Sequence, residues 1–308
     1  MSGGCPALRV SLALAVVGVG AAAAVDPAAC ARERAKIAAE AAVRGGTGVL
    51  WHKHVQKSGR HAICEVARSF ALFSTKTIVR VPGVVATVPS NRCGDWRVDA
   101  YLDGLASAGA ARAVLAASGA AFWAHEFGNR THAPDPRAMA YVAALREPVA
   151  WFRSWARRFG GPAGTAAPPY DPVRASLARQ LGGYVAGDRL GNATAGSPRN
   201  DGPFRRAPPP TAADLLAAAK AYVDAASAVV PIDAAPTAAG LAALRRLGFG
   251  GPGLADALAA NANRTRASNV ALLRAGADRG AHAADAALYD YARGHAERQD
   301  ARRRACGL

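Results

Sequence analysis

One segment of the chain combines residue types that could hold a phosphate group. It lies between residues 49–55, whose alternating apolar side chains predict a strand, and residues 62–73, whose apolar side chains recur at helical spacing. In a tight turn between a strand and a helix, backbone N–H groups can converge on an anion, and the start of the helix adds positive potential. The residues between the two elements that would form such a cradle are Lys57, Ser58, Gly59, Arg60 and His61.

The side chains of this segment suggest separate roles. Lys57 would neutralise charge that develops on a leaving oxygen, Ser58 would donate a hydrogen bond, and Gly59 would let the backbone approach the anion closely. Arg60 and His61 could add further donors. The spacing is not that of a Walker A loop, which requires G-x-x-x-x-G-K-[ST].

A second candidate anion site contains Arg146 and Ser154. Residues 141–145 predict a strand, and Pro148 suits the first turn of a helix that runs to Phe159. A guanidinium is a forked and permanently charged donor, and a hydroxyl adds a neutral one. Because Arg146 follows a strand and Ser154 lies two turns into a helix, both could face one anion.

The candidate general base is His125, at the end of a strand predicted over residues 120–125. A histidine titrates near neutral pH, which suits the removal of a proton from a hydroxyl group. Glu126 is the alternative base. His52 and His54 alternate along the first predicted strand, and we interpret them as structural.

The segments Trp51–His61 and Ala144–Ser154 resemble the Golgi carbohydrate sulfotransferases, especially the heparan sulfate 2-O and 6-O branch. That family has a strand ending in H-x-P-K-[ST]-G-G-[ST] and a later strand ending in L-R-[DE]-P-x-x-R-x-x-S. Residues 285–292 resemble its D-x-x-L-Y-x-[YF]-A motif, whereas residues 160–280 match nothing in it. The family's proline, second glycine, following hydroxyl residue and internal arginine are replaced here by Gln56, Arg60, His61 and Trp151.

The resemblance implies an enzyme that transfers a sulfuryl group from PAPS (3′-phosphoadenosine 5′-phosphosulfate) to a hydroxyl of a carbohydrate. The turn at Lys57 would then hold the 5′-phosphosulfate, Arg146 and Ser154 would hold the 3′-phosphate, and His125 or Glu126 would deprotonate the acceptor. Such a scheme requires no metal. The alternative is a protein that keeps this frame and binds acidic glycan or nucleotide without turnover. A small-molecule kinase is disfavoured by the absence of a Walker glycine pattern.

Strands that alternate with helices predict an α/β fold with a parallel sheet flanked by helices. The resemblance implies that this is the P-loop-like sulfotransferase fold. Tyr289 and Tyr291 are predicted to pack in the core, and the arginine-rich tail is predicted to be solvated. The remaining predicted elements are one or two strands in residues 77–88 around Pro82-Gly83, and helices over 26–44, 101–117, 173–186, 211–229, 241–247 and 283–293.

The net charge of +16, from 38 basic and 22 acidic residues, favours an anionic partner such as a nucleotide or an acidic glycan. No zinc-ligand spacing and no aromatic nucleic-acid motif accompanies that charge, so we expect no nucleic acid as partner.

The chain begins with features of a secretory protein. Arg9 precedes an apolar run, residues 10–24, that ends in three alanines, which is typical of a signal peptide or a short membrane anchor. We therefore expect a signal or anchor over 1–24, a stem over 25–44 and a sulfotransferase domain over 45–308. Three N-x-[ST] sequons agree with a glycoprotein of the Golgi lumen or a secreted one.

The cysteines beyond the signal-like segment are Cys30, Cys64, Cys93 and Cys306, and none has metal-ligand spacing with another. One disulfide is plausible in an oxidising compartment, without a predicted pairing. Cys64 is interpreted as a buried thiol.

Overall fold

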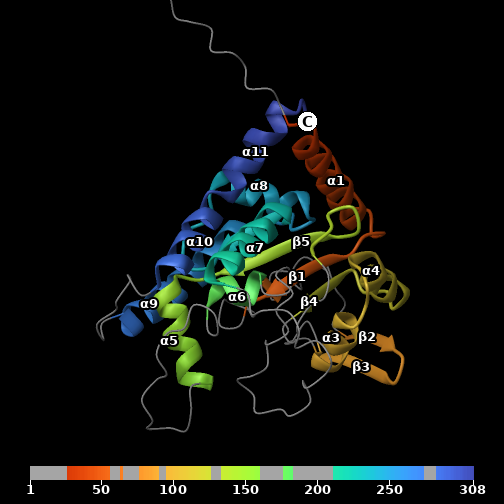
Figure 1. Cartoon of the computed structure of the whole chain (residues 1–308), viewed down its shortest axis with the longest axis horizontal. Helices are drawn as coiled ribbons and strands as arrows, with labels where there is room; N and C mark the ends of the chain where they lie inside the picture. Colours follow the sequence, from red (N-terminus) through yellow and green to blue (C-terminus); the bar gives the residue numbers. More distant parts are fainter. Residues whose placement is uncertain are drawn as a thin grey trace, which may run out of the picture.

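A parallel four-stranded sheet forms the centre of the computed structural model (Figure 1), which describes residues 26–55, 63–64, 76–89, 95–125, 133–159, 176–182, 211–273 and 282–308. The strand order is β4-β1-β5-β6, and every neighbouring pair is parallel. The strands are β1 (Leu50–His54), β4 (Phe122–His125), β5 (Ala140–Leu145) and β6 (Ala228–Pro231). The predicted α/β architecture is therefore confirmed, and three of these strands lie where the sequence placed them.

The fourth strand corrects a prediction. The helix expected over residues 211–229 ends at Ala225, and residues 228–231 form β6 instead. Thr211 and Asp214 make the capping box that starts this helix, whereas Ala226 at its end adopts an extended conformation. The β-branched pair Val229 and Val230 then continues into the sheet as a strand.

Helices cover both faces of the sheet, as predicted for a parallel sheet. One face packs against α3 (Trp96–Asp103), α4 (Ala108–Ala117), α5 (Pro148–Phe159), α6 (Leu177–Gly182), α7 (Ala212–Ala225) and α10 (Ala283–Arg293). The other face packs against α1 (Pro27–Arg44), α8 (Ala238–Arg246) and α9 (Leu254–Leu273). The sequence predicted α5 and α10, but it predicted no helix in the region of α9.

A separate antiparallel hairpin contains β2 (Lys76–Val81) and β3 (Val84–Pro89). Its turn lies at Pro82-Gly83, as expected, and Gly83 has a φ of 76°, which favours glycine. The single helix predicted over residues 101–117 is two helices, because Asp95 caps α3 and Ser107 starts α4 with a second side-chain cap.

The C-terminal helix α11 (His295–Ala305) is joined to α1 by a disulfide between Cys30 and Cys306. The predicted disulfide is thus confirmed. Cys64 is buried, as predicted, but it is also disulfide-bonded, so its interpretation as a thiol was wrong.

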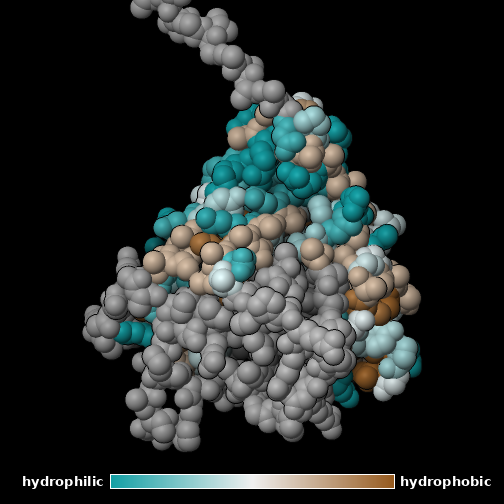
Figure 2. Space-filling model, viewed as in Figure 1, coloured by the Kyte–Doolittle hydropathy of each residue, from teal (hydrophilic) through white to brown (hydrophobic). Residues whose placement is uncertain are grey.

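The tail arginines are not a solvated end, contrary to the prediction. Arg303 is 6% exposed and donates hydrogen bonds to Glu33 and to both carboxylate oxygens of Glu40 on α1, at 2.7 to 3.1 Å. Hydrophilic residues gather around this α1–α11 pole, at the top of Figure 2. No helix in the described ranges is both long and apolar enough to cross a membrane.

Candidate functional site

In this strand order, the expected position of a ligand-binding crevice is at the carboxyl ends of β1 and β5. The chain leaves β1 for β4 on one side and later reaches β5 on the other side, so the direction of strand addition reverses between β1 and β5. In open parallel sheets, ligands bind outside the carboxyl ends of the strands at this reversal. His54 of β1 lies beside Ala144 of β5, so the residues that follow the two strands begin next to each other.

Arg146 directly follows β5 at this position. It is 7% exposed, and its Nε donates to Asn269 Oδ1 at 2.7 Å while one terminal nitrogen donates to Ser268 Oγ at 3.1 Å. Both acceptors are neutral side chains of α9. Burial lowers the pKa of the Arg146 guanidinium, and the charges of Asp233 and Glu147 oppose that shift only in part. The guanidinium keeps its charge because even a lowered arginine pKa leaves it protonated near neutral pH.

Asp233 organises the groups around Arg146. Its carboxylate accepts from the Glu147 backbone N–H at 2.7 Å, from Asn269 Nδ2 at 2.8 Å and from the Tyr289 hydroxyl. Burial, followed by the charge and hydrogen bond of Asp233, raises the pKa of Tyr289, so the hydroxyl remains a donor. Tyr289, predicted to be a packing residue, therefore also orients a buried carboxylate, and Asn269 bridges that carboxylate to Arg146.

No protein-family model, curated protein or solved structure matches this chain.

The cluster around Arg146 and Asp233 also fixes the first turn of α5. Glu147 Oε2 accepts from the Ala150 backbone N–H at 2.8 Å, which caps the helix that Pro148 begins. Ser154 lies two turns along α5 and is half-buried. In the described part of the chain, no interaction joins it to Arg146. Trp151, at the position of the family's internal arginine, is fully buried and stacks with Trp155 at 6.3 Å between ring centroids.

His125 lies at the carboxyl end of β4, beside Lys53 of β1, and is 0% exposed. Its Nε2 is 2.9 Å from Asp103 Oδ1, and its Nδ1 is 3.2 Å from Lys53 Nζ. A lysine ammonium can only donate, so Nδ1 accepts and the ring proton lies on Nε2, donated to Asp103. The ring also stacks on Trp51, with centroids 5.1 Å apart.

The arrangement at His125 is suited to proton transfer. Asp103 would stabilise the imidazolium through Nε2, as the carboxylate does in a Ser-His-Asp triad, while Nδ1 takes the proton. A substrate hydroxyl would have to replace Lys53 at Nδ1. His52, by contrast, is fully buried, and burial lowers its pKa to about 3, in keeping with a structural role. Nothing is described of the His54 side chain.

Several predicted site residues lie outside the described part of the chain: Lys57, Ser58, Gly59, Arg60, His61 and Glu126. The described residues contain no group of three or more histidine, cysteine, aspartate or glutamate side chains that could hold a metal ion.

Two residues of the motif at 285–292 form hydrogen bonds to other parts of the fold, and one of them contacts the candidate site. Asp285 accepts from the backbone N–H groups of Leu177 and Ala178 at 2.9 and 3.0 Å, which fixes the start of α6, and Tyr289 binds Asp233 one helical turn later. Sequence reasoning missed Lys53, Asp103, Asp233, Ser268 and Asn269. Only Lys53 carried a local signal, as a lysine within a segment whose apolar alternation predicts a strand.

Proposed function

We propose that this protein is a PAPS-dependent sulfotransferase that transfers a sulfuryl group to a hydroxyl of a carbohydrate acceptor, on a P-loop-like sulfotransferase fold. One observation carries the proposal. Arg146 lies at the strand reversal with neutral hydrogen-bond partners, next to the strand that precedes Lys57 in the sequence. A cation without a direct carboxylate partner leaves positive potential for an anion.

The candidate site residues would divide the work of the reaction. Arg146, with Ser154 as a neutral donor, would bind the 3′-phosphate, and the Lys57–His61 segment would bind the 5′-phosphosulfate. The acceptor oxygen would attack sulfur, and the bond between sulfur and the 5′-phosphate oxygen would break. The acceptor proton would pass to Nδ1 of His125, with Asp103 stabilising the imidazolium, and Lys57 would stabilise the leaving phosphate. Glu126 remains the alternative base.

The compartment and the acceptor are part of the same proposal. The Cys30–Cys306 disulfide supports an oxidising compartment such as the Golgi lumen or the cell exterior. The net charge of +16 supports an anionic glycan as acceptor. A second candidate function is glycan or nucleotide binding without turnover, which the replacement of the family's internal arginine by the buried Trp151 favours.

Calorimetry with PAP, the desulfated nucleotide, tests the proposal. Wild type is expected to bind at micromolar concentration, and Arg146→Gln is expected to bind about 10- to 100-fold more weakly, as for the loss of a charge-assisted hydrogen-bond donor. Arg137→Gln, at an exposed arginine that pairs with Asp135, is the matched control and should leave PAP affinity unchanged. Absence of PAP binding to folded wild type would refute the assignment.

Transfer of radiolabelled sulfate from PAPS to a panel of glycans separates the two candidate functions. Incorporation that is lost in His125→Ala supports the enzyme. Tight PAP binding without incorporation into any glycan would favour the binding protein.

A further inference from the structure

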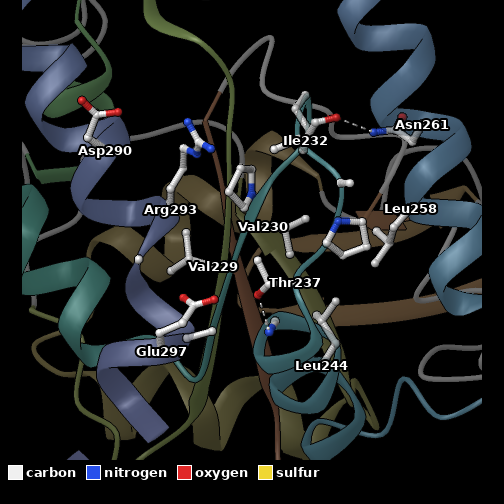
Figure 3. Close-up of a pocket in the computed structure, with 17 residues that line it drawn as sticks. Val229, Val230, Ile232, Thr237, Leu244, Leu258, Asn261, Asp290, Arg293 and Glu297 are labelled. Atoms are coloured by element: carbon white, nitrogen blue, oxygen red, sulfur yellow. Dashed lines mark hydrogen bonds between the residues drawn. The ribbon is translucent and has the colours of Figure 1, made fainter. Parts of the chain in front are cut away.

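A cavity of about 460 Å³ lies along the outer edge of β6, and none of the candidate site residues is among those that line it. Its floor is formed by β6 and the loop that follows, one wall by α8 and α9, and the other by α10 and α11 (Figure 3). Apolar side chains dominate the floor and the α8–α9 wall, with Val229, Ile232, Leu244 and Leu258 among them. Charged residues lie only on the α10–α11 wall.

The floor of this cavity is an unpaired strand edge. β6 is the last strand of the sheet, and it pairs only with β5 in the described structure. The Ser227 backbone N–H donates to the Tyr141 carbonyl of β5 at 2.8 Å. Because consecutive residues of a strand direct their backbone polar groups to opposite sides, the N–H and C=O of Val230 are turned away from β5, toward the cavity that Val230 lines.

The charged wall carries one basic residue, Arg293, and two acidic residues, Asp290 and Glu297. In Figure 3, Arg293 and Glu297 extend from the α10–α11 side toward β6, whereas Asp290 points away. Arg293 and Glu297 are exposed, and among the described residues neither forms a salt bridge or a side-chain hydrogen bond. A guanidinium is therefore available for a carboxylate, and a carboxylate is available for an N–H donor.

We propose that this cavity, named here the β6-edge groove, binds a short extended peptide with an apolar side chain and a free carboxyl end. The backbone of the peptide pairs with the N–H and C=O of Val230, as in strand addition to a sheet edge. Its apolar side chain lies between Leu244 and Leu258, and its terminal carboxylate binds Arg293. The groove is large enough for about three residues of this kind.

The β6-edge groove is separate from the nucleotide site but shares a segment with it. Ile232 and Ala234 line the groove, whereas Asp233 between them turns its carboxylate to Tyr289 and Asn269. A bound peptide would therefore contact the chain on both sides of the carboxylate that helps to hold Arg146. The proposal does not depend on sulfate transfer, because it rests on the strand edge and the groove walls alone.

The test uses three tripeptides on the full chain: acetyl-Ala-Val-Leu with a free carboxyl end, the same peptide ending in a carboxamide, and the acid form with N-methylated backbone nitrogens. Titration is followed by ¹H–¹⁵N NMR of the Val230 amide. We expect the free acid to shift this signal saturably, and the N-methylated peptide to fail because its backbone cannot donate. In Arg293→Gln, affinity for the acid should fall about tenfold while affinity for the carboxamide is unchanged.

Two substitutions, one in the loop after β6 and one at the start of α8, report on the groove itself. Ala235 is exposed and lines the groove, so Ala235→Trp should block binding. Ala238 is exposed and does not line it, so Ala238→Trp is the matched control and should bind as wild type does. The proposal is overturned if the free acid does not shift the Val230 amide at millimolar concentration. It is equally overturned if the N-methylated peptide binds as well as the free acid, since the groove would then hold any apolar group.

Discussion

Two clusters of buried charge in this protein use arginine in opposite ways. At the α1–α11 pole, Arg303 donates directly to the carboxylates of Glu33 and Glu40, which are themselves almost fully buried. At the carboxyl ends of the strands, Arg146 donates to an amide oxygen and a hydroxyl, and Asp233 is reached only through Asn269. Carboxylates therefore neutralise the charge of Arg303, whereas the neutral partners of Arg146 position its guanidinium without neutralising it.

The direction of each pKa shift reflects this difference. Burial lowers the pKa of the Arg303 guanidinium, but the hydrogen bonds and charges of Glu40 and Glu33 outweigh burial, so the net shift is upward. For Arg146 burial prevails, and the net shift is downward. A buried arginine is thus better evidence for a binding site when its hydrogen-bond partners are neutral than when they are carboxylates.

The largest expected effect concerns the stability of the α1–α11 cluster. Arg303→Met removes both hydrogen bonds to Glu40 and one to Glu33, which keeps Lys36 and Arg302 as partners. Breaking a buried pair such as Arg303–Glu40 costs about 3–5 kcal/mol of unfolding free energy. Chemical denaturation would measure the loss. Arg304→Met, at the exposed neighbouring arginine, is the control and should change stability little. PAP affinity of folded Arg303→Met should equal that of wild type, and a large decrease would contradict the separation of the two clusters.

The second prediction concerns acid. His295 is buried at the α1–α11 pole, its Nε2 lies 3.1 Å from the Ala226 carbonyl, and burial lowers its pKa well below the usual value. The unfolded chain therefore binds a proton that the folded chain does not, so this contribution to stability is complete above the ordinary histidine pKa and is lost as pH falls below it.

His295→Gln keeps a donor for that carbonyl but cannot titrate. Between pH 8 and pH 5, wild type should lose about 2 kcal/mol more unfolding free energy than the variant. Denaturation at the two pH values measures the difference. His52, which also titrates far below its usual range, is present in both proteins and cancels. Equal losses in the two proteins would show that His295 is not held neutral.

The smallest expected effect compares two tyrosines on one helix. The Tyr289 hydroxyl binds Asp233 near Arg146, and the Tyr291 hydroxyl donates to Asp224 at 2.7 Å on the side of the α1–α11 cluster. Tyr289→Phe and Tyr291→Phe should each cost about 1 kcal/mol of stability through a lost hydrogen bond. Only Tyr289→Phe should also weaken PAP binding, by about two- to threefold, because Asp233 then offsets the charge of Arg146 more strongly. Equal PAP affinities in the two variants would remove Asp233 from the site.

Sequence periodicity predicted those elements whose pattern is set locally. The alternation around Trp51 gave β1, Pro82-Gly83 gave the hairpin turn, and Pro148 marked the start of α5. The predictions failed where tertiary contacts outweighed the local sequence pattern. Val229 and Val230 continue an alanine-rich helical pattern, and it is the pairing with β5 that makes them a strand.

The candidate site was predictable only in part, for a similar reason. Arg146 and His125 were visible because each follows a predicted strand, and the carboxyl ends of parallel strands meet at one edge of the sheet. Asp233 and Asn269 come from residues 160–280, which carry no recognisable motif, and contacts that span more than 80 residues of sequence leave no local signal. The same limit hid the partners of Arg303, which lie 263 and 270 residues away.

The Cys30–Cys306 crosslink has a practical consequence. It holds the start of α1 beside the last residues of the chain, so both ends of the described chain leave the molecule at one pole, at the top of Figure 1 and remote from α5 and the hairpin. A tether attached at either terminus therefore anchors the same end of the protein. Immobilised through its C-terminus on a sensor surface, the protein would turn the end that contains α5 and the hairpin toward the solution.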